Sequence, residues 1–145
     1  MKKILLTLVV AMFCSISVMA DDMPIEYNKV PANARAVITK YFPTSTVTAA
    51  TKDAEFLGGA EYSVYLNNGA KVEFDSKGVW KEVECGTMAV PAGIVPVKIA
   101  SYVKANYEGS DIVKIDVDKN DYEIRLSTGL ELKFNLKGDF IGIDD

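Results

Sequence analysis

Hydrophobic and polar residues alternate along two stretches of the chain, and the two stretches resemble each other. Residues 62–78 read YSVYLNNGAKVEFDSKG, and residues 122–138 read YEIRLSTGLELKFNLKG. The matching positions are 60 residues apart throughout, as Tyr62 and Tyr122 are. Alternation with a period of two is typical of half-buried strands, and the Asn-Asn-Gly of the first stretch is typical of a hairpin turn. Each stretch therefore predicts a strand, a tight turn and a second strand.

A helix is predicted ahead of each stretch. Val30-Pro31 and Val95-Pro96 open these helices, since proline is favoured at a first helical position, where its missing N–H is not needed. Pro43 ends the first helix because the residue before a proline avoids the helical region, and Glu108-Gly109-Ser110 ends the second. Apolar residues recur at helical spacing at Ala34, Val37, Ile38 and Tyr41 in the first helix and at Ile99, Tyr102 and Val103 in the second.

The remaining segments complete two tandem units. Each unit is one helix followed by about four antiparallel strands, at residues 21–84 and 95–145, with a small-residue linker at 85–94. Asp21–Lys29 is polar and is predicted to be a mobile lead-in to the first helix. The outer strands of the units are predicted at Val47–Glu55, Val79–Glu84, Asp111–Asp118 and Phe140–Ile143.

The N-terminus has the pattern of a secretory signal peptide. Lys2-Lys3 is positively charged, Ile4–Cys14 is apolar but too short to span a bilayer comfortably, and Val18-Met19-Ala20 offers a cleavage site. We therefore predict that residues 1–20 are removed and that the mature protein is periplasmic or secreted, with no integral membrane segment. A retained membrane anchor is the alternative.

The predicted mature chain is acidic and has no histidine. The leader contains two lysines and no acidic residue, so its loss takes the formal net charge from −4 to −6. An acidic surface repels phosphate backbones, which argues against nucleic acid as a partner. Without histidine the chain lacks the usual general base at neutral pH and the commonest transition-metal ligand. We therefore expect a protein that is not an enzyme and needs no cofactor.

Cys85 is the one cysteine left after cleavage, so no internal disulfide is expected. The neighbouring Glu84 carboxylate disfavours a reactive thiolate. We expect Cys85 to be a buried structural residue.

Three motifs occur in both units: a Val-Pro helix opening, Tyr-x-Val/Ile-x-Leu-x-x-Gly, and Phe-Asp/Asn-x-x-Gly-x-aromatic. With these motifs the mature chain resembles the PepSY-like, beta-lactamase-inhibitor-like family of exported proteins along nearly its whole length. The resemblance implies a tandem α+β fold with the helices packed on one face of a curved antiparallel sheet. It also implies export and a binding or inhibitory role. The second unit departs from the first, with Phe140 in place of Trp80 and Asn135 in place of Asp75.

The candidate binding residues alternate with the apolar ones, on the sheet face away from the core. Tyrosine and arginine are typical anchors of interfaces, although antiparallel sheets often leave one face simply in water. Trp80 joins the set only if the preceding turn places it beside Glu73. Another turn length would place it opposite Phe74, in the core. The candidate residues are Tyr65, Lys71, Glu73, Trp80, Glu123, Arg125, Glu131 and Lys133.

Asp116, Asp118 and Asp121 are a candidate calcium set, because oxygen ligands at alternating positions suit calcium. The pattern is incomplete, since the expected glycine is Asp121 itself and the expected final glutamate is Ser127. A polar hairpin with solvated carboxylates is the alternative.

We therefore expect an exported, non-enzymatic binding module. It would dock another envelope protein or a peptide on its open sheet face or edge, and inhibition of that partner is one implied role. The alternative is a small-molecule or calcium-ion binding protein of the periplasm.

Overall fold

The computed structural model describes residues 22–55 and 59–144, and the predicted signal peptide lies outside them. The described chain contains nine strands, two α-helices and one turn of 3-10 helix. The helical elements are η2 (Tyr27–Lys29), α2 (Ala32–Tyr41) and α3 (Val97–Asn106). The strands are β1 (Asp22–Pro24), β2 (Val47–Glu55), β3 (Gly59–Leu66), β4 (Lys71–Phe74), β5 (Trp80–Glu84), β6 (Ile112–Val117), β7 (Asp121–Leu126), β8 (Glu131–Asn135) and β9 (Phe140–Asp144).

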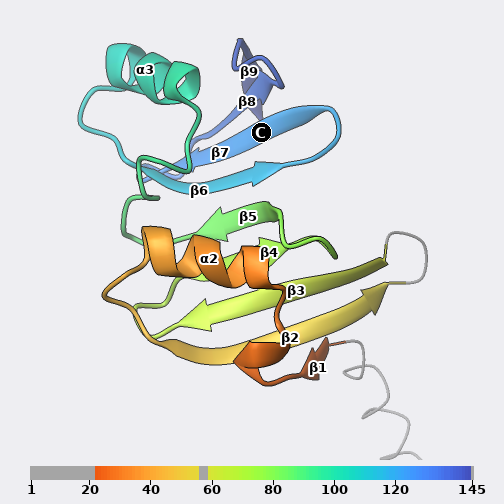
Figure 1. The fold of residues 1–145 in the computed structure, drawn as a ribbon. Coiled ribbons are helices and arrows are strands. Elements are labelled where there is room, and N and C mark those ends of the chain that lie inside the picture. The colour runs from red at the N-terminus through yellow and green to blue at the C-terminus, as the bar shows by residue number, and fades with distance from the viewer. Residues whose placement is uncertain (1–21, 56–58, 145) are drawn as a thin grey trace, which may run out of the picture.

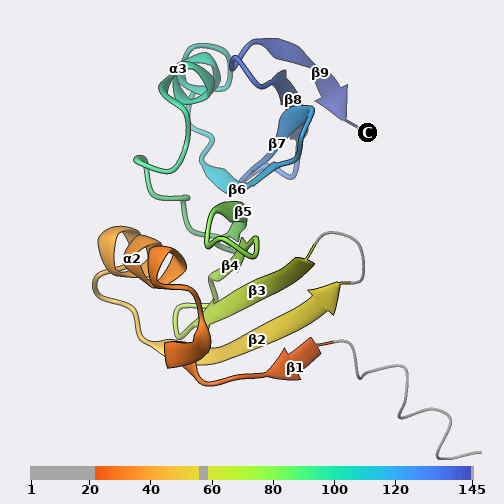
Figure 2. The same cartoon turned by 45° about the vertical axis from the view of Figure 1, so that its right-hand side comes forward.

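All nine strands belong to one antiparallel sheet, in which each strand pairs with the strands before and after it in the chain. The sheet curves strongly from β2 to β9, and both α-helices lie on the same side of it (Figures 1 and 2). The predicted helices and outer strands are confirmed to within one or two residues at most ends. Periodicity therefore identified the elements well.

The predicted fold class, an α+β fold of two tandem helix-plus-strand repeats, is wrong. The strands form one continuous nine-stranded sheet because β6 pairs directly with β5. The linker itself takes part: Cys85 N–H donates to Val113 O at 2.9 Å, and Val90 N–H donates to Ile112 O at 2.8 Å. A sheet edge carries unpaired backbone groups that accept a further strand. The second set of strands therefore extends the first sheet instead of forming its own.

The predicted mobile lead-in is also wrong for the residues that the structure describes. β1 pairs with β2, with Asp22 opposite Asp53 and Pro24 opposite Thr51. Ile25 N–H continues this pairing by donating to Ala50 O at 2.9 Å. Backbone pairing does not require apolar side chains, so a polar segment can be held at a sheet edge without a hydrophobic pattern to reveal it.

The two α-helices start and stop in the same way. Pro31 and Pro96 are their N-caps, with φ,ψ of −51°,142° and −53°,135°. Their C-caps, Phe42 and Tyr107, donate backbone N–H groups to Ile38 O and Val103 O respectively. Each proline therefore lies one residue before the first helical position that was predicted for it. Its C=O accepts the first helical hydrogen bond, from Arg35 N–H in α2 and from Ala100 N–H in α3.

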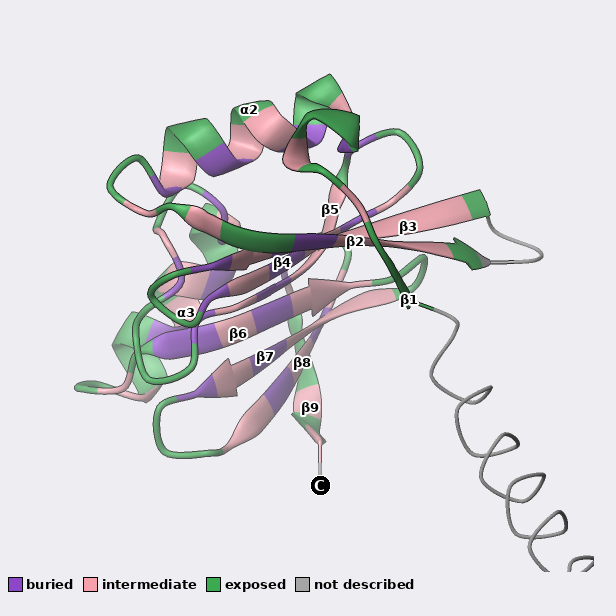
Figure 3. Ribbon diagram, turned by 90° about the horizontal axis from the view of Figure 1, so that it is seen from below, coloured by how far each residue is buried: buried purple, intermediate pink, exposed green. Residues whose placement is uncertain are grey.

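The core lies between the helices and the covered face of the sheet. Val64, Ile124 and Leu132 are fully buried, whereas their neighbours along each strand are half-buried. This alternation is visible along β4, β6 and β7 in Figure 3. The two helices contribute to one cluster with the strands, since Ile38 and Ile99 both belong to it. The predicted assignment of apolar positions to the covered face is confirmed.

Gly78 is predicted to be more sensitive to substitution than Gly69. Both have the left-handed φ that the turn pattern indicated, +83° and +89°. A Cβ on Gly78 would stand 2.9 Å from Ala34 N at the start of α2, whereas a Cβ on Gly69 would meet nothing within 4 Å. We expect Gly69→Ala to cost about 1–2 kcal/mol through backbone strain. Gly78→Ala should cost a further ~1–3 kcal/mol because the turn and the helix must separate.

Urea denaturation of the two variants beside wild type measures this difference. Equal midpoints for the two variants would contradict the proposed contact between the turn and α2.

Candidate functional site

Two rows of charged side chains cross the open face of the sheet. The strand pairing places Glu73 opposite Glu82, Glu82 opposite Asp116, and Asp116 opposite Glu123. We call these four residues the acidic row. The next row, which we call the mixed row, runs across the same strands and β8. It consists of Lys71, Glu84, Lys114, Arg125 and Glu131. Side chains directly opposite each other on one face lie close enough to interact.

Ion pairs connect the two rows across the central strands. Lys114 Nζ lies 3.7 Å from Glu82 Oε1 and 4.0 Å from Asp116 Oδ2. Lys114 and Glu82 are the least exposed of these side chains, at 22% each. The middle of the open face is therefore partly shielded from water, and its charges interact more strongly than charges on a fully exposed surface.

Arg125 is held by two carboxylates of the mixed row. Its Nε and Nη2 both donate to Glu131 Oε1, at 2.9 and 2.8 Å. Its Nη1 lies 3.8 Å from Glu84 Oε1. These contacts fix the guanidinium across β5, β7 and β8, so it is already oriented before any partner arrives.

Apart from Trp80, the candidate residues lie on one face of the sheet, where they alternate with buried residues along each strand. Tyr65 lies opposite Lys71, whose Nζ stands 5.8 Å from the centre of the tyrosine ring. Lys71 also pairs with Glu73 at 2.7 Å. Lys133 pairs with Glu123 at 3.2 Å. The structure brings together candidates from both halves of the sequence.

Trp80 lies elsewhere. A β-bulge at Glu73/Phe74 places Trp80 opposite Phe74, and its side chain packs against the core. The structure thus adopts the core alternative for this residue.

The candidate calcium residues have three different surroundings. Asp116 belongs to the acidic row, whereas Asp118 Oδ1 accepts the backbone N–H groups of Asn120 and Asp121 and so closes the β6–β7 turn. The Asp121 carboxylate lies 4.0 Å from Lys133 Nζ. Within residues 22–55 and 59–144, no three acidic or cysteine side chains form a group that could hold a metal ion.

Burial and neighbouring charge raise the pKa of two residues of the acidic row, Asp116 and Glu82. Desolvation raises the pKa of Asp116 to about 6, and Glu123 contributes to this rise while Lys114 opposes it. Desolvation also raises the pKa of Glu82, with Glu73 adding to the effect. Like charges on adjacent strands disfavour ionisation. Asp116 and Glu82 therefore hold their charges at an energetic cost near neutral pH.

Cys85 is buried, as predicted, and takes part in the core. Desolvation raises the pKa of its thiol to about 11, and the charge of Glu84 adds to the rise. The thiol is therefore protonated at neutral pH, which suits a structural role.

The centre of this site was not among the predicted candidate residues. Glu82, Glu84 and Lys114 lie on β5 and β6, which were assigned to separate units. Their alternation with Val83 and Ile115 follows the same period of two, and that pattern could have placed them on the open face. Only the pairing of β5 with β6 makes them central.

The fold and this surface define a class of small protein whose sheet is covered by helices on one face and carries ordered charges on the other. A profile of the family described as "Putative beta-lactamase-inhibitor-like, PepSY-like" matches residues 60–142. The chain belongs to this PepSY-like family. A comparison with curated proteins finds no match.

Solved structures of similar proteins agree with this assignment. A Bacteroides thetaiotaomicron protein described as a "putative calcium-regulated periplasmic protein" is 44% identical, with a TM-score of 0.82, over 86% of this chain and 98% of its own. Two Bacteroides vulgatus proteins, each described as a "putative periplasmic protein", are 41% and 36% identical, each with a TM-score of 0.82. They cover 88% and 86% of this chain, and 99% of each relative is covered. The chain is accordingly a periplasmic protein.

The helices of the described residues are all too short or too polar to cross a membrane.

Asp116→Asn is predicted to flatten the dependence of stability on pH. The folded state raises the Asp116 pKa from 3.8 to about 6, so between these values the folded chain binds more protons than the unfolded chain. Stability from this group therefore falls as pH rises through that window. At pH 7.5 we expect Asp116→Asn to be more stable than wild type by about 1–2 kcal/mol, a value reduced for partial exposure.

Thermal melts at pH 5.0 and 7.5 measure this effect. Glu108→Gln, which removes one exposed carboxylate away from the open face, is the control for net charge. A wild-type protein that gains no stability relative to Asp116→Asn on acidification would contradict the assignment.

Proposed function

We propose that this protein is a non-enzymatic binding module of the periplasm that docks another envelope protein or a peptide on its open sheet face. The observation that supports this best is the pair of charged rows, which spans both halves of the chain on the face that the helices leave uncovered. A surface needed only for solubility would not require so many ion pairs between its own charged side chains.

The internal ion pairs favour binding because they prepare the surface in advance. The Arg125 guanidinium is held by Glu131 and Glu84, and Lys114 stands between Glu82 and Asp116. Side chains with restricted rotamers lose less entropy when a partner immobilises them. Strands also position side chains more rigidly than loops do.

The charge pattern suggests what the partner presents. The acidic row has four carboxylates in succession, and the pKa of Asp116 and of Glu82 is raised. A basic side chain of a partner would relieve this repulsion, and Arg125 and Lys71 in the next row would attract a carboxylate beside it. The best-matched partner is therefore a segment that carries a basic and an acidic side chain on the same face. Electrostatic complementarity of this kind contributes mainly to specificity and association rate.

Tyr65→Ala and Arg125→Ala are predicted to weaken capture of the partner while leaving folding intact. Both side chains are half-buried on the open face, so their truncation should change stability by no more than about 1 kcal/mol. Truncation of an interface anchor can cost about 2 kcal/mol or more of binding. The measurement is capture of envelope proteins by the mature protein, with a thermal melt of each variant.

Val64→Ala and Ile124→Ala are the matched controls, because each lies one residue away on the buried face. They should lose stability through core cavities. Early melting of Tyr65→Ala or Arg125→Ala would overturn the assignment of faces. Normal melting with unchanged capture would reduce the open face to a solvated surface.

The edge of the sheet offers a separate route to a partner. β9 is the last strand of the sheet, and Ile141 and Ile143 on it are more than half exposed. A peptide could add to such an edge by strand pairing. Loss of capture in Ile143→Lys, with capture retained in Arg125→Ala, would move the docking site from the face to β9.

Calcium binding is the second candidate function. Its support is the description of the B. thetaiotaomicron relative as calcium-regulated, together with the pairing of Asp116 with Glu82 in the acidic row. The described residues contain no group of three acidic side chains that could hold a metal ion, so such a site would need further oxygen ligands. Calcium prefers several carboxylate oxygens, and a cation at Asp116 and Glu82 would relieve their mutual repulsion. If the row binds calcium, millimolar CaCl₂ should raise the melting temperature of wild type more than MgCl₂ does, because a ligand specific to the folded state stabilises it.

The double variant Asp116→Asn, Glu82→Gln should lose this calcium-dependent shift. Equal shifts with the two salts, or a shift that survives in the double variant, would remove the acidic row as a calcium site.

A further inference from the structure

Two segments of the chain, residues 26–47 and 91–112, share one local structure with a constant offset of 65. The segments begin with matching turns, in which Lys29 N–H donates to Glu26 O at 2.9 Å and Ile94 N–H donates to Pro91 O at 3.0 Å. They end with matching loops after the helices. Ser45 N–H donates to Phe42 O and Ser110 N–H donates to Tyr107 O, both at 3.1 Å. Positions in the two segments can therefore be compared one by one.

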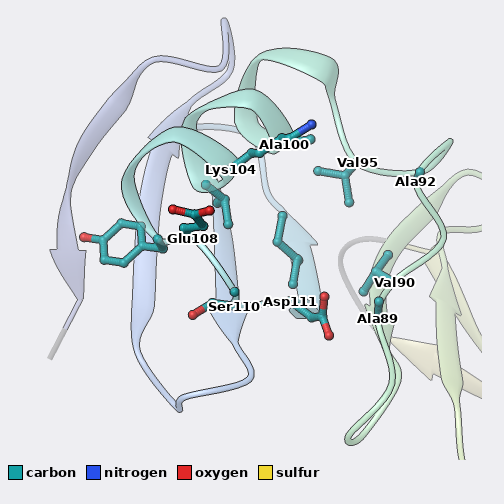
Figure 4. Close-up of a pocket in the computed structure, with 13 residues that line it drawn as sticks. Ala89, Val90, Ala92, Val95, Ala100, Lys104, Glu108, Ser110 and Asp111 are labelled. Atoms are coloured by element: carbon teal, nitrogen blue, oxygen red, sulfur yellow. The ribbon is translucent and has the colours of Figure 1, made fainter.

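A pocket of about 410 Å³ lies in the second segment, between the linker and the end of α3. In Figure 4, Val90 and Ala92 of the linker and Val95, just after it, lie across the pocket from α3 and the loop that follows α3. Val103 and Tyr107 of α3 also line it, and most of the lining is apolar. A mainly apolar pocket of this size, with a few polar groups, is typical of small-molecule sites.

The first segment has a corresponding pocket of about 380 Å³. All eight lining positions of the first pocket match lining positions of the second after the offset is applied. Among them are Ile38 with Val103, Thr39 with Lys104, Phe42 with Tyr107, and Val47 with Ile112. The two pockets are therefore the same feature of the fold.

The two pockets differ at the residue that comes from the preceding turn. In the first pocket this residue is Tyr27, whose half-buried ring packs against the core. Burial raises the pKa of the Tyr27 phenol, and the charge of Arg35 partly offsets the rise. In the second pocket the matching residue is Ala92, which is exposed. The chain supplies an aromatic ring to the first pocket and only a methyl group to the second.

The rims of the pockets differ as well. Thr39, Pro43 and Thr46 of the first pocket are uncharged. The matching residues of the second pocket are Lys104, Glu108 and Asp111, and all three are exposed. The second pocket thus combines an apolar interior that lacks its aromatic ring with charged groups at its opening.

We propose that the second pocket binds a small single-ring aromatic molecule, whose ring takes the place that Tyr27 occupies in the first pocket and whose polar group meets the charged rim. The first pocket indicates which ligand would fit the second. There the chain places the phenol ring of Tyr27 beside the end of α2 and the start of β2, which correspond to the end of α3 and the start of β6. Tyr107 offers an aromatic partner on one side of the site, and aromatic rings favour such contacts beyond their buried area. The site lies at the linker and α3, so it is distinct from the open sheet face.

Binding of 4-methylphenol, which is the tyrosine side chain as a free molecule, tests the proposal. We expect saturable changes in the NMR methyl signals of Val90, Val95, Val103 and Ile112, with a dissociation constant on the order of 1 mM for so small a ligand. Ala92→Tyr should fill the pocket from within, weaken binding by about tenfold or more, and raise the melting temperature. Ala105→Tyr is the matched control, because Ala105 is an exposed residue of α3 that does not line the pocket, and it should bind as wild type does.

Tyr27→Ala provides the reciprocal measurement. It should create a second site for 4-methylphenol, seen as new saturable changes at Ile38 and Val47, while the site at Ala92 is unchanged. Unsaturable changes in wild type, or equal affinity in Ala92→Tyr and wild type, would overturn the proposal. Changes in wild type confined to Ile38 and Val47 would also overturn it, because the ligand would then prefer the pocket that already contains a ring.

Discussion

The pairing of β5 with β6 is the contact on which the rest of the molecule depends. Three residue pairs join the two strands, and at their centre Val83 lies opposite Ile115 with both side chains fully buried. The linker reinforces the pairing through the hydrogen bonds of Cys85 and Val90 to the residues around β6. Without this contact, both β5 and β6 would be sheet edges with unpaired backbone groups. With it, both helices cover one sheet and share one core.

The same contact creates the open face as a single surface. Glu82 and Glu84 on β5 meet Asp116 and Lys114 on β6, so the charges of the two halves interact instead of facing water separately. Partial burial of Lys114 and Glu82 makes these interactions stronger than ordinary surface pairs. The pairing of β5 with β6, which the sheet needs for its stability, therefore also produces the charged rows on which the proposed binding function rests.

Matching positions in the two halves of the chain pack in the same places but carry different side chains. In the first half, Trp80 lies opposite Phe74. In the second, Phe140 lies opposite Phe134 and stacks on Tyr102 of α3, with ring centres 4.7 Å apart. A smaller ring on the strand is accompanied there by an additional ring on the helix. In the two corresponding pockets, the change from Tyr27 to Ala92 replaces an aromatic ring with a methyl group.

The sequence by itself determined the two α-helices, the strands from β2 to β9, the turn glycines and the buried face of these strands. Period-two alternation fixes which side of a strand is apolar, and the Gly78 turn requires a φ that few other residues adopt. The hydrophobic pattern of the sequence also placed Tyr65, Arg125 and Lys133 on one face of the sheet. Only the tertiary structure decided that the halves form one sheet, that β1 closes its edge and that Trp80 faces the core. Strand pairing and bulges depend on backbone hydrogen bonds between distant residues, and backbone groups are the same in every sequence, so no local pattern specifies them.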